Sequence, residues 1–167
     1  MKKIVSALLL SAAISAPAFA AGGKNNVEVN YGLDLNGVIG IQGDFDISSS
    51  VGAPVSVEAV YKNYSQSYSL PFFGTYKWSY TGIGVAGIYD LSSSFKLDPK
   101  IRPYVGLGLM HLSATYSGPA GAATFTSPTS GGVYVTGGVK YMVNPQFAAD
   151  LNYNNRGGLT IGGAFYF

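Results

Sequence analysis

The last nine residues, Leu159-Thr160-Ile161-Gly162-Gly163-Ala164-Phe165-Tyr166-Phe167, carry the pattern that decides the fold class. Large apolar residues dominate the odd positions, while small or hydroxyl-bearing residues dominate the even ones. Successive side chains of a β-strand point to opposite faces, so this period of two predicts an amphipathic strand that ends at Phe167.

The same alternation recurs upstream between clusters of Gly, Pro, Asn, Asp and Ser, which are turn-forming residues. Charged and amide side chains fall on one face of nearly every stretch, and Val, Leu, Ile and Phe fall on the other. The pattern predicts an all-β protein, an eight-stranded antiparallel up-and-down barrel. The strands are expected at 26–34, 38–47, 54–66, 77–91, 101–116, 132–143, 146–154 and 157–167.

The start of the chain has a different composition. A pair of lysines precedes the uncharged run Ile4–Ile14, and Ala18-Phe19-Ala20 follows with the small–any–small pattern of a cleavage site. The run is shorter than the roughly 20 apolar residues that a spanning helix needs. Residues 1–20 are therefore predicted to be a cleaved signal peptide, and residues 21–167 to form the barrel domain.

Two observations favour a barrel in the outer membrane over a secreted soluble calyx. Only 11% of the residues are charged, against roughly a quarter in soluble domains. Aromatic residues also gather near the expected strand ends, as in the girdles of membrane barrels. One girdle would hold Phe45, Tyr89, Tyr141, Phe147, Phe165 and Phe167, and the other would hold Tyr31, Tyr61 and Tyr153. Four further aromatic residues are expected on the inner side unless a bulge shifts the register: Trp78, Tyr80, Tyr104 and Tyr134.

Composition excludes several function classes. The chain has no cysteine, which rules out disulfides and thiolate metal sites. A net charge of +2 gives no reason to expect nucleic acid as a partner. A single histidine with scattered carboxylates predicts no metal site, and no motif predicts a cofactor.

An even number of strands places both chain ends on the periplasmic side. The segments 69–76 and 117–131 then become outer loops. We expect any extracellular ligand to bind through them, since such barrels carry their long loops outside.

Several motifs mark a family resemblance. The terminal Phe167, with Phe165 two residues before it, resembles the strand that the barrel-assembly machinery recognises in bacterial outer-membrane proteins. The stretches Gly82–Leu91, Ile101–Gly108 and Gly137–Pro145 resemble the small eight-stranded family of opacity proteins and Neisserial surface protein A. The resemblance implies an outer-membrane surface protein with a structural or loop-mediated binding role, in contact with outer-membrane lipid.

Charged residues on the inner face are expected to pair, because an unpaired buried ion is costly. A salt-bridge network would then plug the lumen, which in an eight-stranded barrel is just wide enough for side chains; a narrow channel is the alternative. The predicted network comprises Glu28, Asp44, Glu58, Lys62, Asp90, Arg102, Lys140 and Asp150, together with Asp46.

An enzymatic alternative rests on His111 and Ser113. Outer-membrane lipid A deacylases use a His and a Ser at this spacing, the His acting as the base that activates the Ser. The sequence departs from that pattern, because Ala114 replaces the expected asparagine and no glutamate follows Glu58. An interfacial histidine on the apolar face is therefore the favoured interpretation, and no enzymatic activity is predicted.

Overall fold

A computed structural model describes residues 24–33, 38–72, 74–95, 97–119, 124–126 and 130–167. The predicted signal peptide and the first predicted turn, residues 35–37, lie outside this part of the chain. Among the described residues, no helix is both long and apolar enough to cross a membrane.

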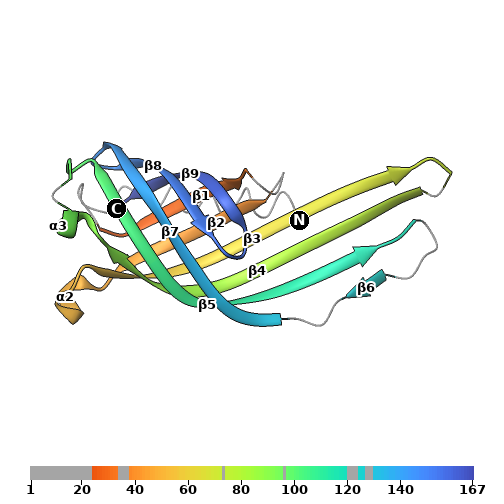
Figure 1. The fold of residues 1–167 in the computed structure, drawn as a ribbon, viewed down its shortest axis with the longest axis horizontal. Coiled ribbons are helices and arrows are strands. Elements are labelled where there is room, and N and C mark those ends of the chain that lie inside the picture. Colours follow the sequence, from red (N-terminus) through yellow and green to blue (C-terminus); the bar gives the residue numbers. More distant parts are fainter. Residues whose placement is uncertain (1–23, 34–37, 73, 96, 120–123, 127–129) are drawn as a thin grey trace.

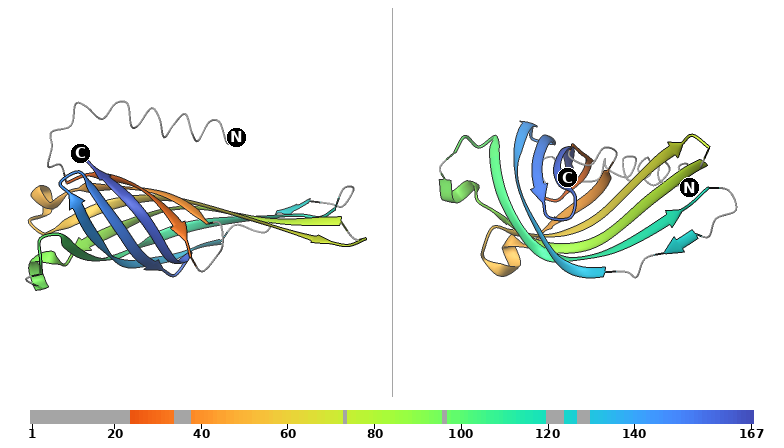
Figure 2. Two further views of the ribbon diagram at one scale, coloured as in Figure 1. Left: turned by 90° about the horizontal axis from the view of Figure 1, so that it is seen from above. Right: turned by 45° about the vertical axis from the view of Figure 1, so that its right-hand side comes forward.

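The described residues form a closed antiparallel barrel, which confirms the predicted fold class (Figures 1 and 2). Each strand pairs with its neighbour in the chain, and β1 pairs with β9 to close the circle. The barrel strands are β1 (Asn26–Gly32), β2 (Ile39–Asp46), β3 (Val55–Leu70), β4 (Gly74–Asp90), β5 (Ile101–Ser117), β7 (Ser130–Asn144), β8 (Phe147–Asn154) and β9 (Gly158–Tyr166). A short ninth strand, β6 (Thr124–Thr126), pairs only with the end of β5.

Both ends of the described chain lie at one end of the barrel, where Asn26 pairs with Tyr166. We call it the terminal end and the opposite one the far end. The terminal end also carries two one-turn helices, α2 (Ser48–Val51) and α3 (Ser92–Phe95), inside segments predicted as plain turns. Each helix begins at the first serine of an Asp-(Ile/Leu)-Ser-Ser-Ser sequence, which occurs at 46–50 and again at 90–94. Its carboxylate accepts the backbone N–H of the first serine, at 3.1 Å for Asp46–Ser48 and 2.8 Å for Asp90–Ser92.

The outer surface of the barrel is apolar, as the alternation predicted. Leu107 and Leu109 are exposed over about two-thirds of their surface, as Ile83 and Val85 are over more than half. Aromatic side chains are exposed near both ends of the barrel wall. They are Phe45, Tyr89, Tyr141 and Phe147 toward the terminal end, and Tyr31, Tyr61 and Tyr153 toward the far end.

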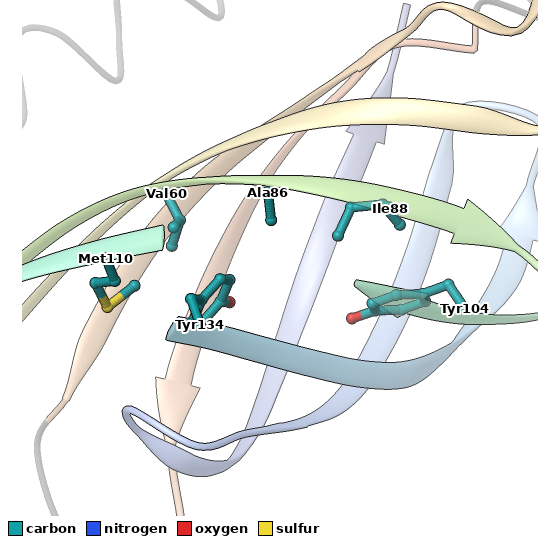
Figure 3. Close-up of a cluster of buried hydrophobic side chains, with 6 residues drawn as sticks. All are labelled: Val60, Ala86, Ile88, Tyr104, Met110 and Tyr134. Carbon is teal, nitrogen blue, oxygen red and sulfur yellow. The ribbon is translucent and has the colours of Figure 1, made fainter. Parts of the chain in front are cut away.

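The inside of the barrel holds the core. Val60, Ala86, Ile88, Tyr104, Met110 and Tyr134 are buried against one another in the lumen (Figure 3). Tyr104 and Tyr134 therefore lie on the inner side, as the alternation predicted. No bulge shifts the register of β5 or β7 at these residues. The one register shift in the described pairing of β7 with β8 lies at Met142/Asn144. Gly108 makes room for this packing, since a Cβ there would collide with the carbonyl oxygen of Val85 and the Cα of Ala86.

The prediction of a loop at 69–76 is wrong. β3 continues to Leu70 and β4 begins at Gly74, so only a tight turn with Phe72 at positive φ separates them. The pairing of β3 with β2 ends at Asn63, and that of β5 with β7 ends at Leu112. Beyond these points β3, β4 and β5 run on as a sheet that projects from the far end of the barrel (Figures 1 and 2).

We call this sheet the projection. It comprises residues 64–70 of β3, 74–80 of β4, 113–117 of β5, and β6. The predicted loop at 117–131 is shortened as well, because β6 and the start of β7 fall within it. β3 and β4 extend because the period of two continues through residues 64–70 and 74–80, even though the polarity of the outer side changes.

Candidate functional site

The projection has one aromatic face and one polar face. The side that continues the lumen carries Tyr64, Gln66, Tyr68, Leu70, Tyr76, Trp78, Tyr80, Ala114 and Tyr116. The side that continues the outer wall carries Ser65, Ser67, Ser69, Thr75, Lys77, Ser79, Ser113, Thr115 and Ser117. On the barrel wall the outer side of the same strands is apolar, so the outer side changes from apolar to polar where the projection begins.

The aromatic side chains contact one another across the three strands. Tyr64 and Tyr80 have ring centroids 5.9 Å apart, and Tyr116 lies 4.8 Å from Trp78 and 6.2 Å from Tyr76. The face still stays open, because Tyr68 is 53% exposed and Trp78 is 42% exposed. Large apolar area left open to water in this way commonly marks a binding surface.

A cavity of about 650 Å³ opens where this face meets the barrel mouth. Its aromatic wall consists of Tyr64, Tyr68, Trp78 and Tyr80, with Leu112 beside them. A shallower cavity of about 410 Å³ follows toward the tip and shares Tyr68 and Trp78 with the first. The two cavities thus form a continuous aromatic path.

Two cations line the inner end of the larger cavity. Lys62 is 5% exposed, and its ammonium lies 5.4 Å from the centroid of the Tyr134 ring. Arg156 stands in the turn between β8 and β9 and uses its Nε to donate to the Val133 carbonyl at 3.2 Å. Within the described part of the chain, neither cation has a carboxylate oxygen within 4.0 Å.

The turn that holds Arg156 is fixed to the start of β7. Asn155 accepts the backbone N–H of Val135 at 3.0 Å and donates to the Val133 carbonyl at 3.1 Å. These bonds keep Arg156 over the cavity rather than in solvent, and its side chain is only partly exposed.

The middle of the lumen contains a network centred on Lys140. Its ammonium lies 2.7 Å from Asp44 Oδ2 and 3.4 Å from Glu28 Oε2, with the Tyr104 ring at 5.4 Å on another side. Asn26 donates to the same Asp44 oxygen at 3.0 Å. Three residues predicted for the network, Glu28, Asp44 and Lys140, are thus brought together and buried.

The other predicted lumen residues form smaller groups. Arg102 pairs with Asp90 at 2.6 Å near the terminal end, while Asp150 accepts the Tyr104 hydroxyl at 3.0 Å. Glu58 and Lys62 are buried but form no ion pair with each other. At the rim, Asp46 is bonded to Ser48 and lies 3.5 Å from Lys24.

The residues of the enzymatic alternative lie on the outer wall. His111 pairs across strands with Ile83, and Ser113 with Thr81. No hydrogen bond or ion pair of the described side chains joins His111 to Ser113 or to a carboxylate. The part of the chain that the structure describes also contains no group of three or more His, Asp or Glu arranged to hold a metal ion.

The sequence indicated that aromatic residues near 69–76, among them Tyr68 and Tyr76, could contact a partner, but it did not show that they form one face of a projecting sheet or that Arg156 lies beside it. The signal was present, because Tyr64-Ser65-Gln66-Ser67-Tyr68-Ser69 alternates as strictly as any barrel strand. The stretch has no charged residue, and its small residues are all serines. It therefore resembles a loop in composition and a strand in period.

Comparison with known proteins identifies the family. A model of the outer membrane protein beta-barrel domain matches residues 6–161. The chain belongs to this family. A comparison with curated protein sequences gave no match.

Three solved structures have the same fold at low sequence identity. Neisserial surface protein A is 23% identical, with a TM-score of 0.57 over 86% of this chain and 93% of that one. The N-terminal β-barrel domain of Pseudomonas aeruginosa OprF is 15% identical, with a TM-score of 0.59 over 86% and 95%. Ail, the attachment invasion locus protein of Yersinia pestis in complex with the heparin analogue sucrose octasulfate, is 12% identical, with a TM-score of 0.51 over 85% and 92%. The chain is thus an outer-membrane β-barrel protein.

Proposed function

We propose that this protein is a surface-binding protein whose projection stands outside the cell and binds an extracellular partner on its aromatic face. The observation that carries the proposal is the change of polarity along β3 and β4. An apolar outer wall suits lipid, whereas the serine- and threonine-rich outer side of the projection suits water. The aromatic face then meets water as well and is available to a ligand.

The lumen is proposed to be plugged rather than conducting. Lys140, Asp44 and Glu28 meet across the barrel, and the rings of Tyr104 and Tyr134 are buried in the lumen as well. Eight strands leave a lumen just wide enough for such side chains. The barrel would then serve as an anchor for the projection.

No enzymatic role is proposed. His111 lies on the outer side of the barrel wall and Ser113 on the polar outer side of the projection, and among the described residues neither has an acidic partner. Export would depend on the signal peptide at 1–20, and insertion on the terminal Phe165 and Phe167 as the signal for the barrel-assembly machinery. Phe165 belongs to β9 and packs on Phe147 of β8, with ring centroids 5.1 Å apart.

The binding function is tested by attachment of whole cells. A Gram-negative strain is made to display the wild-type protein, a Tyr68→Ser/Trp78→Ser variant or a Lys77→Gln variant, and attachment to a surface coated with extracellular matrix is measured. We expect the wild type and Lys77→Gln to raise attachment above the empty strain and the double variant to lose the gain. Equal attachment by all strains would overturn the proposal, provided that heat-modifiable gel mobility shows each barrel folded.

A further inference from the structure

We propose that the cavity at the base of the projection binds an acidic saccharide, with pyranose rings stacked on the tyrosines and tryptophan and an acidic group held by Lys62 and Arg156. The inference rests on the proposed function and names the chemistry of its ligand. The proposed ligand is a saccharide from outside the cell. The experiment distinguishes it from the envelope's own lipopolysaccharide and from an anionic lipid.

The two cations indicate that the ligand carries an acidic group. Lys62 is buried, lines the cavity and donates no hydrogen bond to any side chain or carbonyl that the structure describes. Toward the residues that the structure describes, the Arg156 side chain donates only from its Nε, so its other guanidinium nitrogens are available to a ligand. A buried cation without an ion-pair partner is costly, and an anion bound between these two side chains would offset that cost. Guanidinium groups suit carboxylate, sulfate and phosphate in particular, because they donate two parallel hydrogen bonds.

The aromatic residues that line the cavity indicate that the ligand is a saccharide. A site for an acyl chain would be lined mainly by aliphatic residues, but here Tyr64, Tyr68, Trp78 and Tyr80 form the surface. Aromatic rings provide flat, rigid contact area, and their hydroxyl and N–H groups provide hydrogen bonds. This combination matches a pyranose ring, which has an apolar C–H face and hydroxyl groups around its edge. Gln66 adds an amide, and its Oε1 already accepts the Tyr64 hydroxyl.

The length of the aromatic path indicates more than one sugar ring. Tyr68 and Trp78 belong to both cavities, and Tyr76, Tyr116 and Leu70 continue the surface toward the tip. Because the cations stand only at the inner end, the acidic group of the ligand would point toward the barrel and the chain would run outward along the projection.

The experiment uses Trp78, the only tryptophan in the chain, as a built-in reporter. The folded protein in phospholipid nanodiscs is titrated with a tetrasaccharide of alternating glucuronate and N-acetylglucosamine, and separately with chitotetraose, which lacks the carboxylates. We expect the acidic probe to change Trp78 emission and to bind at least about tenfold more tightly than the neutral one, as one charge-assisted hydrogen bond implies.

Variants separate the two halves of the site. Lys62→Met and Arg156→Gln should each weaken the acidic probe about tenfold and leave the neutral probe unchanged, whereas Tyr68→Ser should weaken both. Lys77→Gln is the matched control, because it removes one positive charge from β4 on the opposite face. Unboiled gel mobility is recorded for every variant, so that only folded protein is compared.

Any of five results would overturn the inference. Equal affinity for the two probes, or an equal loss in Lys77→Gln, would show that the cavity does not select acidic sugars. Displacement of the acidic probe by palmitate, or abolition of its binding when lipopolysaccharide is built into the nanodisc, would assign the cavity to a lipid or to the envelope itself. If cells still attach through Tyr68 and Trp78 while no saccharide binds, the ligand class is wrong and the proposed surface-binding function stands.

Discussion

Strands β3, β4 and β5 run from the barrel wall into the projection, yet their outer side is apolar in the wall and polar in the projection. In β4, Ile83 and Val85 face outward from the barrel, and Ser79 and Lys77 face outward from the projection in the same register. The backbone does not change; the medium outside it does. The alternation of residue types therefore predicts that a segment is a strand. Whether the residues of one face are apolar or polar indicates whether that face meets lipid or water.

The largest effect is expected where the wall is packed most tightly. Gly108→Val should prevent folding, because a branched side chain would have to occupy the space of the Val85 carbonyl and Ala86. Gly87 in the adjacent strand has open space around its Cβ position, so Gly87→Val should fold normally. The shift in gel mobility between unboiled and boiled samples measures folding. A folded Gly108→Val protein would contradict the packing described for the lumen.

The next prediction compares two buried lysines, one in the barrel and one at the base of the projection. Lys140→Met leaves Asp44 and Glu28 without their cation, and breaking such a buried pair costs about 3–5 kcal/mol. Lys62 lacks an ion pair, so Lys62→Met should cost about 1 kcal/mol or less, the range of an ordinary single substitution. Urea unfolding in lipid vesicles measures both. Equal losses would show that Lys62 also stabilises the lumen, and would weaken its assignment to a ligand.

A third prediction locates the membrane boundary on β4 with one kind of substitution. Val85→Lys places a charge on the lipid face and should cost about 2–4 kcal/mol near the middle of the bilayer. Ser79→Lys, six residues earlier on the same side of the same strand, should change the free energy of unfolding by less than about 0.5 kcal/mol. A large loss in Ser79→Lys would place the projection in lipid and remove the basis for an aqueous aromatic face.

The sequence predicted the barrel well because its determinants are local. The period of two gave the eight strands, and the buried faces of Glu28, Asp44 and Lys140 follow from parity alone. Which charges meet across the lumen depends instead on the tilt and closure of the whole barrel. Lys140 and Asp44, 96 residues apart in the chain, could not be paired from periodicity.

The projection was missed for a different reason. Serine and glycine are common in loops, and Tyr68-Ser69-Leu70-Pro71 was interpreted by composition although its alternation continues that of β3. Pro71 marks the actual turn. The lesson is that outside the membrane the period of a strand is a better guide than its hydrophobicity, since both faces can then be solvated.

The smallest effect on global stability is expected at Tyr80, on the aromatic face. Each strand of the closed barrel pairs on both sides, whereas within the described part of the chain the outer part of β3 pairs only with β4. The projection should therefore open locally while the barrel stays intact, because elements with few buried contacts open at low free energy. Tyr80→Ser removes the contact with Tyr64 and should speed amide exchange at residues 64–70 and 74–80 only. Exchange at residues 82–90, inside the barrel wall, should stay unchanged. Faster exchange in both segments would mean that wall and projection unfold as one unit, and that the aromatic face helps to stabilise the barrel in addition to any ligand that it binds.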